Sequence, residues 1–170
     1  KDGWNRFKKD GNWEYDIVEM GYKYNLTDYA ACFGLWQMNQ IEKWQLRRDE
    51  IVKKYINGLN HIDSIYLPKI LEGHSKHLFV IRLDLDKWSI SRNIFIEKMN
   101  KKGIGLAVHY KPLHQLSYYK NKYHFKIDNF PMANLLYESI ISLPIYPKLS
   151  DSSLDQIINS ITELHDMYSK

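Results

Sequence analysis

The chain has 170 residues, of which 44% are hydrophobic and 26% charged, a composition typical of one globular domain. The single cysteine excludes an intramolecular disulfide and a cysteine-based zinc site, and no apolar run is long enough to span a membrane, so we expect a cytoplasmic protein. The net charge of +4 permits an anionic ligand but does not require nucleic acid, because acidic residues are mixed among the basic ones.

The first segment, residues 1–26, combines glycines, lysines and aromatic side chains without a regular period. We predict an irregular segment that is anchored by its aromatic residues, since flexible linkers are poor in such residues. The segment has no apolar signal region and no initiator methionine, so we expect it to be the interior of a longer chain.

A long helix is predicted over residues 27–60, with Thr27 or Asp28 as its N-cap. Its apolar residues recur three or four positions apart, at Ala31, Leu35, Met38, Ile41, Val52, Tyr55 and Leu59. Cys32 lies within this pattern and is expected to be a small buried core residue. The helix would be about 48 Å long, which exceeds a domain of this size, so we expect it to pack along another domain or subunit.

The remaining residues, 61–170, alternate between short strands and helices. The strand pattern covers residues 65–67, 77–84, 104–110 and 141–144. Helices are expected over 92–102, capped by Ser91, over 131–140, and from Ser150 or Asp151 to 167. The inward-facing residues would be Ile94, Phe95 and Met99 in the first, and Leu154, Ile157, Ile158, Ile161 and Leu164 in the last. Residues 114–130 are expected to be irregular, with one turn near Tyr118. This order predicts an α+β fold, a small sheet with helices on one face.

Two places carry polar residues suited to a binding site. His109 ends a predicted strand beside the turn Lys111-Pro112, which suits either a site residue or a histidine that bonds a neighbouring loop, and His114 belongs to the same loop surface. Residues 21–28 place Lys23 and Asn25 before a helix N-terminus, a favourable place for a phosphate, although the segment could simply cap and pack. No Cys, His and carboxylate set predicts a metal site.

Several segments together resemble the DegT/StrS-type nucleotide-sugar aminotransferases, and they occur in that family's order and at about its spacing. These segments are Gly21-Tyr22-Lys23-Tyr24-Asn25-Leu26-Thr27-Asp28 with Arg47-Arg48 after it, His77 to Arg82, Lys102 to Gly105, Val108 to His114, and Ser142 to Pro147. Within the family, the region of Trp4 and the sequence Gly-Tyr-Lys-Tyr-Asn most resemble the corresponding segments of enzymes that aminate 4-keto sugars, such as the aminoarabinose-forming type.

The resemblance implies the C-terminal part of a fold-type I aminotransferase that uses pyridoxal phosphate (PLP). Residues 1–26 would return from a missing large domain, 27–60 would form the interdomain helix, and 61–170 the small C-terminal domain. The family's PLP lysine motif lies upstream and does not occur here, so no catalytic residue is assigned in this chain, which alone would be inactive.

The resemblance also implies the ligands of the complete enzyme. It would move an amino group from glutamate to a keto-deoxyhexose linked to a nucleotide. It would act as a homodimer and supply sugars for cell-surface polysaccharide or lipopolysaccharide. Lys23 and Asn25 would reach the cofactor phosphate, and which of the two makes the contact stays open, because many relatives have Asn and Arg there. Tyr24, His109, Tyr110 and His114 would line the substrate site.

A second interpretation treats the chain as a stand-alone basic α+β module that binds nucleic acid or a protein partner. Its support is the pI near 8.9, the long helix and the interleaved tyrosines and lysines of residues 110–126. Dispersed charge and the absence of a nucleic-acid-binding motif count against this interpretation.

Overall fold

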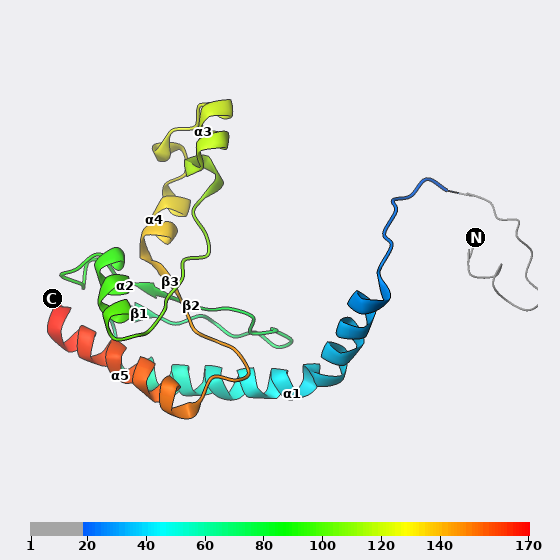
Figure 1. Ribbon diagram of the computed structural model, residues 1–170. Coiled ribbons are helices and arrows are strands. Elements are labelled where there is room, and N and C mark those ends of the chain that lie inside the picture. The colour runs from blue at the N-terminus through cyan, green and yellow to red at the C-terminus, as the bar shows by residue number, and fades with distance from the viewer. Residues whose placement is uncertain (1–18) are drawn as a thin grey trace, which may run out of the picture. The chain divides into compact units, whose positions relative to one another are not determined.

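The computed structural model describes residues 19–170 (Figure 1). The chain divides into two compact units, residues 1–39 and residues 40–170, and each is described by itself. Most of the irregular segment predicted for residues 1–26 lies outside the described residues. The regular elements are α1 (Asp28–Leu59), β1 (Ile65–Tyr66), β2 (Phe79–Leu83), α2 (Arg92–Lys101), the 3-10 turn η2 (Leu113–Gln115), α3 (Ser117–Tyr123), the 3-10 turn η3 (Ile127–Asn129), α4 (Pro131–Ser139), β3 (Ile140–Leu143) and α5 (Asp151–Tyr168).

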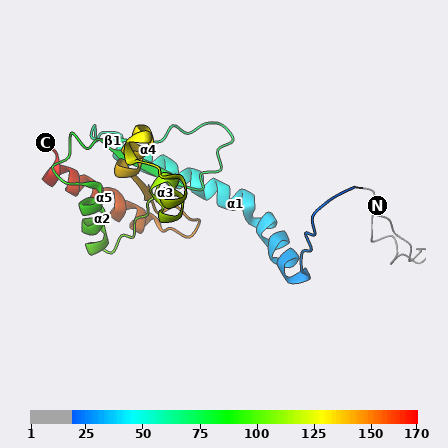
Figure 2. The same ribbon diagram turned by 90° about the horizontal axis from the view of Figure 1, so that it is seen from above.

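The second unit is built on a three-stranded antiparallel sheet in the order β1-β2-β3. Ile65 of β1 pairs with Leu83 of β2, and Phe79 at the other end of β2 pairs with Leu143 of β3. Along β2, alternate residues are buried, which is the period of a strand with one face on the core. In Figures 1 and 2, the second half of α1 and all of α5 run beside this sheet. The predicted α+β fold is confirmed.

The core lies between the sheet and the helices that cover it. In α1, Ile51, Tyr55 and Leu59 are completely buried. The Tyr55 ring stacks on Phe79 at 5.0 Å between centroids, and its hydroxyl donates to the Pro144 carbonyl at 2.8 Å. Because burial penalises the charged phenolate, the pKa of Tyr55 lies well above its usual value. Tyr55 therefore fixes α1 both to the sheet and to the loop after β3.

The long helix is confirmed, and its start is settled at Thr27. The Thr27 side-chain oxygen accepts from the backbone N–H of Ala30 at 3.3 Å, the geometry of an N-cap. The first part of α1 differs from expectation, because Leu35 and Met38 are 68% and 64% exposed in the described chain. Cys32 is also exposed, so its assignment as a buried core residue was wrong. The first part of α1 does have apolar residues at helical spacing, but this apolar face is not covered by any core within residues 19–170.

Three further expectations need correction. The strand predicted over 104–110 is reduced to a single bridge between Ala107 and Ser142, because Gly105 and the turn at Pro112 leave few residues free to pair. Ile94 is 41% exposed, whereas Phe95 and Met99 of α2 are buried as predicted. Residues 114–130 are more helical than expected and contain α3, η3 and the end of η2. The Ser91 and Ser150 caps and the Pro131 helix start are confirmed.

An ionic contact ties the start of α5 to α1. One Arg47 guanidinium nitrogen lies 2.7 Å from Asp151 and also donates to the Leu149 carbonyl at 2.7 Å. Lys54 reaches the other carboxylate oxygen of Asp151 at 3.1 Å. The hydrogen bonds from Arg47 and Lys54 lower the pKa of Asp151, so the carboxylate stays charged at the helix N-terminus, where negative charge is favourable.

At Gly58, α1 and α5 approach each other closely. A Cβ at this position would lie 2.8 Å from Cγ2 and 2.9 Å from Cδ1 of Ile158. We expect Gly58→Ala to lower the free energy of unfolding by about 1 kcal/mol, because overpacking costs about 1–3 kcal/mol and outweighs the helix-propensity gain of about 1 kcal/mol. Urea denaturation followed by circular dichroism measures the change.

Gly34, in the same helix, gives a matched control. A Cβ at Gly34 meets nothing within 4 Å, so Gly34→Ala should stabilise the chain by up to about 1 kcal/mol. Ile158→Ala should also reduce the cost of Gly58→Ala in the double variant. Equal stabilisation by Gly58→Ala and Gly34→Ala would show that the two helices do not meet closely at Gly58.

Candidate functional site

In the first unit, the segment before α1 exposes a set of donor and aromatic groups. Lys23 and Asn25 are exposed, and neither has a hydrogen-bond or ion-pair partner within residues 19–170. Tyr22 and Tyr24 lie with their ring centroids 5.7 Å apart and are both largely exposed. An ammonium group and a side-chain amide close to a helix N-terminus can both donate to an anion.

In the second unit, His109 follows the bridge that holds its loop to β3. Backbone hydrogen bonds join Ala107 and Ser142 in both directions, at 2.8 and 3.3 Å. His109 Nδ1 then lies 2.8 Å from Oγ of Ser142, the one polar residue of β3. This contact orients the half-buried imidazole and leaves Nε2 able to bind a ligand as donor or acceptor, depending on the tautomer.

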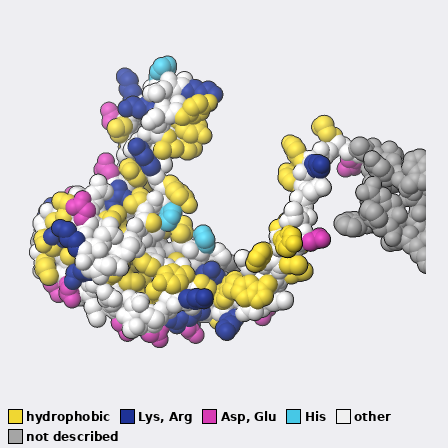
Figure 3. Space-filling model, in the orientation of Figure 1, with side chains coloured by type: hydrophobic (Ala, Val, Ile, Leu, Met, Phe, Trp, Pro, Cys, Tyr) yellow, Lys and Arg dark blue, Asp and Glu magenta, His cyan; other side chains and the backbone are white. Residues whose placement is uncertain are grey.

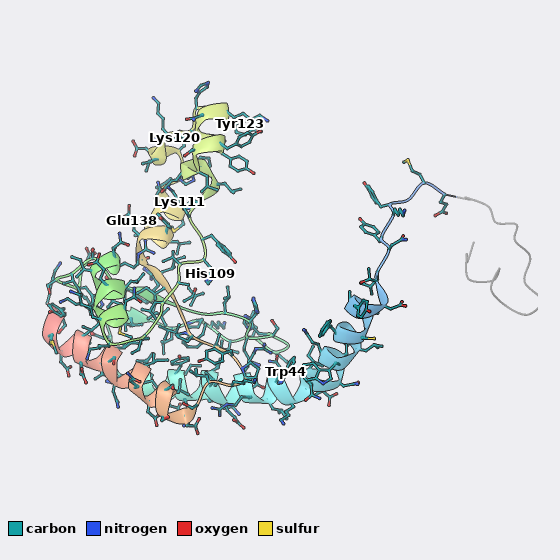
Figure 4. All side chains as sticks on the ribbon, in the orientation of Figure 1. Trp44, His109, Lys111, Lys120, Tyr123 and Glu138 are labelled. Atoms are coloured by element: carbon teal, nitrogen blue, oxygen red, sulfur yellow. The ribbon has the colours of Figure 1, made fainter. Side chains whose placement is uncertain are left out.

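Tyr110 lies directly against His109. The two rings meet edge to face at 4.7 Å between centroids, and Tyr110 is 73% exposed. Figure 4 places His109 and Lys111 on the loop that leads from the sheet towards α3. A histidine, a tyrosine and a lysine therefore follow one another where the chain leaves the sheet.

His114 is buried and serves the packing of the segment that bears α3 and α4. Its Nε2 lies 2.7 Å from Oδ1 of Asn134, which also accepts from Gln115 at 2.7 Å, while Asn134 Nδ2 donates to the Ile127 carbonyl at 2.6 Å. Since the Asn134 amide nitrogen is the donor to Ile127, Oδ1 is the acceptor and His114 Nε2 must carry the proton. The His114 ring also stacks on Phe130 at 4.6 Å.

Beyond His114, aromatic rings continue through α3 and η3. Successive contacts of 5.3–6.4 Å between centroids link Tyr118, Tyr119, Tyr123, Phe125 and Phe130. Figure 3 shows hydrophobic side chains together on one side of α3, with Lys and Arg side chains close by. Lys122 lies 5.4 Å from the ring centres of both Tyr118 and Tyr123. This surface suits a ligand or partner with both flat and anionic parts.

The predicted site residues thus fall into two groups, one in each unit. Lys23, Tyr24 and Asn25 stand before α1, and His109, Tyr110 and His114 belong to the loop between α2 and α3. The sequence interpretation missed Ser142 and Asn134. The signal for Ser142 was a lone polar residue inside an apolar strand, whereas Asn134 is one of several polar residues in its helix.

The described residues offer neither a metal site nor a membrane span. Within the described residues 19–170, no group of three or more His, Cys, Asp or Glu side chains could hold a metal ion. In the same part of the chain, every helix is too short or too polar to cross a membrane.

The fold is that of the C-terminal domain of a fold-type I aminotransferase. The family model for the DegT/DnrJ/EryC1/StrS aminotransferase family matches residues 1–162, and the chain belongs to this family. The resemblance read from the sequence motifs is confirmed.

Individual relatives agree with this assignment. The chain is 37% identical over 166 residues to the uncharacterised protein MJ1066 of Methanocaldococcus jannaschii, and 32% identical over 167 residues to the spore coat polysaccharide biosynthesis protein SpsC of Bacillus subtilis. Each alignment covers 96% of this chain but 43% of the relative. The chain therefore spans less than half the length of these curated relatives.

Among solved structures, Spr1654 of Streptococcus pneumoniae, assigned as a sugar aminotransferase, is similar in fold and sequence. Its PMP form matches with a TM-score of 0.81 and 36% identity, over 98% of this chain and 42% of that one. Its PLP form matches with a TM-score of 0.79 and 35% identity, over 97% of this chain and 42% of that one.

Proposed function

We propose that this chain is the C-terminal part of a PLP-dependent aminotransferase that moves an amino group from glutamate to a keto-deoxyhexose linked to a nucleotide. The observation that carries the proposal is the match over 98% of the chain to Spr1654, which was solved in PLP and PMP forms. The named role of SpsC in spore coat polysaccharide synthesis supports a product used in cell-surface polysaccharide. The enzyme would act in the cytoplasm as a homodimer.

In this proposal the parts of the chain have separate tasks. Residues 1–26 would return from a large domain, residues 27–60 would form the interdomain helix, and residues 61–170 would form the small domain. The upstream domain supplies the cofactor lysine, so the 170-residue chain has no catalytic residue of its own. The match to the aminotransferase family favours this proposal over the alternative, a stand-alone basic module that binds nucleic acid or a protein partner.

The donor set before α1 fits the phosphate of the cofactor. Lys23 and Asn25 are exposed, and the Lys23 ammonium and the Asn25 amide NH2 are donors with no partner elsewhere in the described chain. When bound, PLP supplies the electron sink for amino transfer, while the protein supplies binding and orientation. Lys23 and Asn25 would hold the phosphate, and Tyr24, between them, would face the sugar.

The second unit would supply the contacts to the sugar. His109, held through Nδ1 by Ser142, would offer Nε2 to a hydroxyl or phosphate oxygen, and the exposed Tyr110 beside it would pack on the ring. His114 would contribute mainly through its hydrogen bond to Asn134, which fixes the loop that carries His109 and Tyr110.

The test compares the 170-residue chain with the polypeptide encoded by the complete gene. With glutamate and a nucleotide-linked 4-keto-6-deoxyhexose, the complete polypeptide should release 2-oxoglutarate and the chain alone should not. In addition, borohydride should fix no PLP on a single lysine of the chain alone. A fixed adduct there would overturn the fragment assignment, and a complete polypeptide without 2-oxoglutarate release would overturn the function.

In the complete polypeptide, His109→Ala should lower kcat/KM for the keto sugar by about 10- to 100-fold, because one hydrogen bond to a charged or polar ligand group contributes about 1.5–3 kcal/mol. The glutamate half-reaction should keep its rate, since His109 would touch only the sugar. His61→Ala, which removes an exposed histidine from the loop after α1, is the control. An equal loss in both half-reactions would show that His109 acts on the fold.

A further inference from the structure

A cleft of about 360 Å³ lies within the second unit, between α1 and the loop that joins β3 to α5. It is lined by Trp44, Arg48, Tyr146, Pro147 and Lys148. Trp44 and Arg48 are one helical turn apart and so share one face of α1. Figure 4 marks Trp44 on α1, and in Figure 1 the loop after β3 runs to the same helix.

The two walls of the cleft are held together on both sides of the loop. Before the lining residues, the Pro144 carbonyl accepts from the Tyr55 hydroxyl at 2.8 Å. After them, the Leu149 carbonyl accepts from Arg47 at 2.7 Å, and Arg47 also binds Asp151. The cleft is therefore built by the fold before any ligand arrives, which lowers the entropic cost of binding.

The cleft carries positive charge without a matching acid. Neither Arg48 nor Lys148 has a hydrogen-bond or ion-pair partner in the part of the chain that the structure describes, and Arg48 Nε is buried without an acceptor. The acids nearest in sequence are already engaged: Asp49 pairs with Lys76 at 2.8 Å, and Glu50 pairs with Arg47 at 2.8 Å.

A buried donor that lacks an acceptor is costly, and a bound oxyanion would remove that cost. A guanidinium binds planar or tetrahedral oxyanions through paired N–H groups, and an ammonium adds a point charge. The charge pattern of the cleft thus selects an anion.

The remaining lining residues indicate what kind of group the anion is attached to. Trp44, Tyr146 and Pro147 present flat apolar groups, and most small-molecule sites are mainly apolar with a few polar groups that fix orientation. The volume lies within the range of about 300–1,000 Å³ found for such sites. Inorganic anions alone would leave the apolar walls uncovered.

We infer that this cleft binds a small molecule in which an oxyanion, phosphate or carboxylate, is attached to a planar ring. Arg48 and Lys148 bind the oxyanion, and the rings of Trp44 and Tyr146 contact the ring of the ligand. This inference concerns the second unit alone and does not depend on the proposed amino transfer.

Isothermal titration calorimetry on the 170-residue chain tests the inference, with phenyl phosphate and benzoate as the probes. At least one of them should bind ten or more times as tightly as inorganic phosphate or phenol, and the stronger of the two identifies the oxyanion. Equal affinity for inorganic phosphate and phenyl phosphate would overturn the role of the aromatic residues.

Variants then locate the site. Arg48→Met and Lys148→Gln should each weaken the stronger probe at least tenfold, while Lys101→Gln, which removes an exposed charge from α2, should not. Because Lys148 is exposed, its variant keeps the test valid if Arg48→Met fails to fold. Unchanged affinity in the Lys148→Gln variant, or equal weakening by Lys101→Gln, would overturn the inference.

Discussion

The Trp88→Ala variant should lose about 3–5 kcal/mol of its free energy of unfolding, the usual cost of removing a large buried aromatic side chain. Trp88 is 2% exposed and meets Phe95 edge to face at 5.3 Å. Its indole nitrogen donates to the Ser64 carbonyl at 2.9 Å, and its backbone forms a bridge with Ser169. The loss is a large part of the stability of a typical domain, about 5–15 kcal/mol, and urea denaturation measures it.

Trp88→Phe separates the packing of this residue from its hydrogen bond. It retains a ring but removes one of two hydrogen bonds to the Ser64 carbonyl, which still accepts from the Asp84 N–H at 2.9 Å, so we expect the lost hydrogen bond to cost about 0.5–1.5 kcal/mol. A loss below 1 kcal/mol in Trp88→Ala would show that the turn after β2 is not part of the core.

The Asn134→Leu variant should lose about 3 kcal/mol and loosen the segment from η2 to α4. The substitution leaves the buried His114 Nε2–H and the partly buried Ile127 carbonyl without their partners, and a buried unpaired group costs about 1–3 kcal/mol, a partly buried one less. Hydrogen exchange should rise over residues 113–139 more than in the sheet, because stability is lost locally first.

Asn129→Leu is the matched control for this prediction. Within the described residues, the Asn129 side chain accepts only from the exposed Lys126 N–H at 2.9 Å, so its loss should have a smaller effect. If Asn134→Leu and Asn129→Leu had equal effects, the buried contact to His114 would not hold this segment.

The sequence predicted best the elements whose signals are local. Ser91, Ser150 and Pro131 mark helix starts through caps and a fixed φ angle, and all three helices begin there. The segment 104–110 read as a strand because it is apolar, yet strand formation needs a partner of matching length, and only Ala107 finds one. Periodicity marks an apolar face but does not say what covers it, which is why Leu35 and Cys32 are exposed.

The site was less predictable for the same reason. His109 and His114 were both singled out, but their different surroundings depend on residues far along the chain. Ser142 lies 33 positions after His109, and Asn134 lies 20 positions after His114. One contact leaves a half-exposed ring and the other a buried one, and no local pattern distinguishes the two histidines.

The contacts of α1 with the end of the chain also affect the order of folding. Arg47 reaches Leu149 across 102 positions, and Tyr55 reaches Pro144 across 89. Such contacts require the closure of long loops, which slows folding. During synthesis, the face of α1 that bears Tyr55 is not fully covered until β2 and the loop after β3, which hold Phe79 and Pro144, have left the ribosome. Until then, this apolar face is open to chaperones and to other nascent chains.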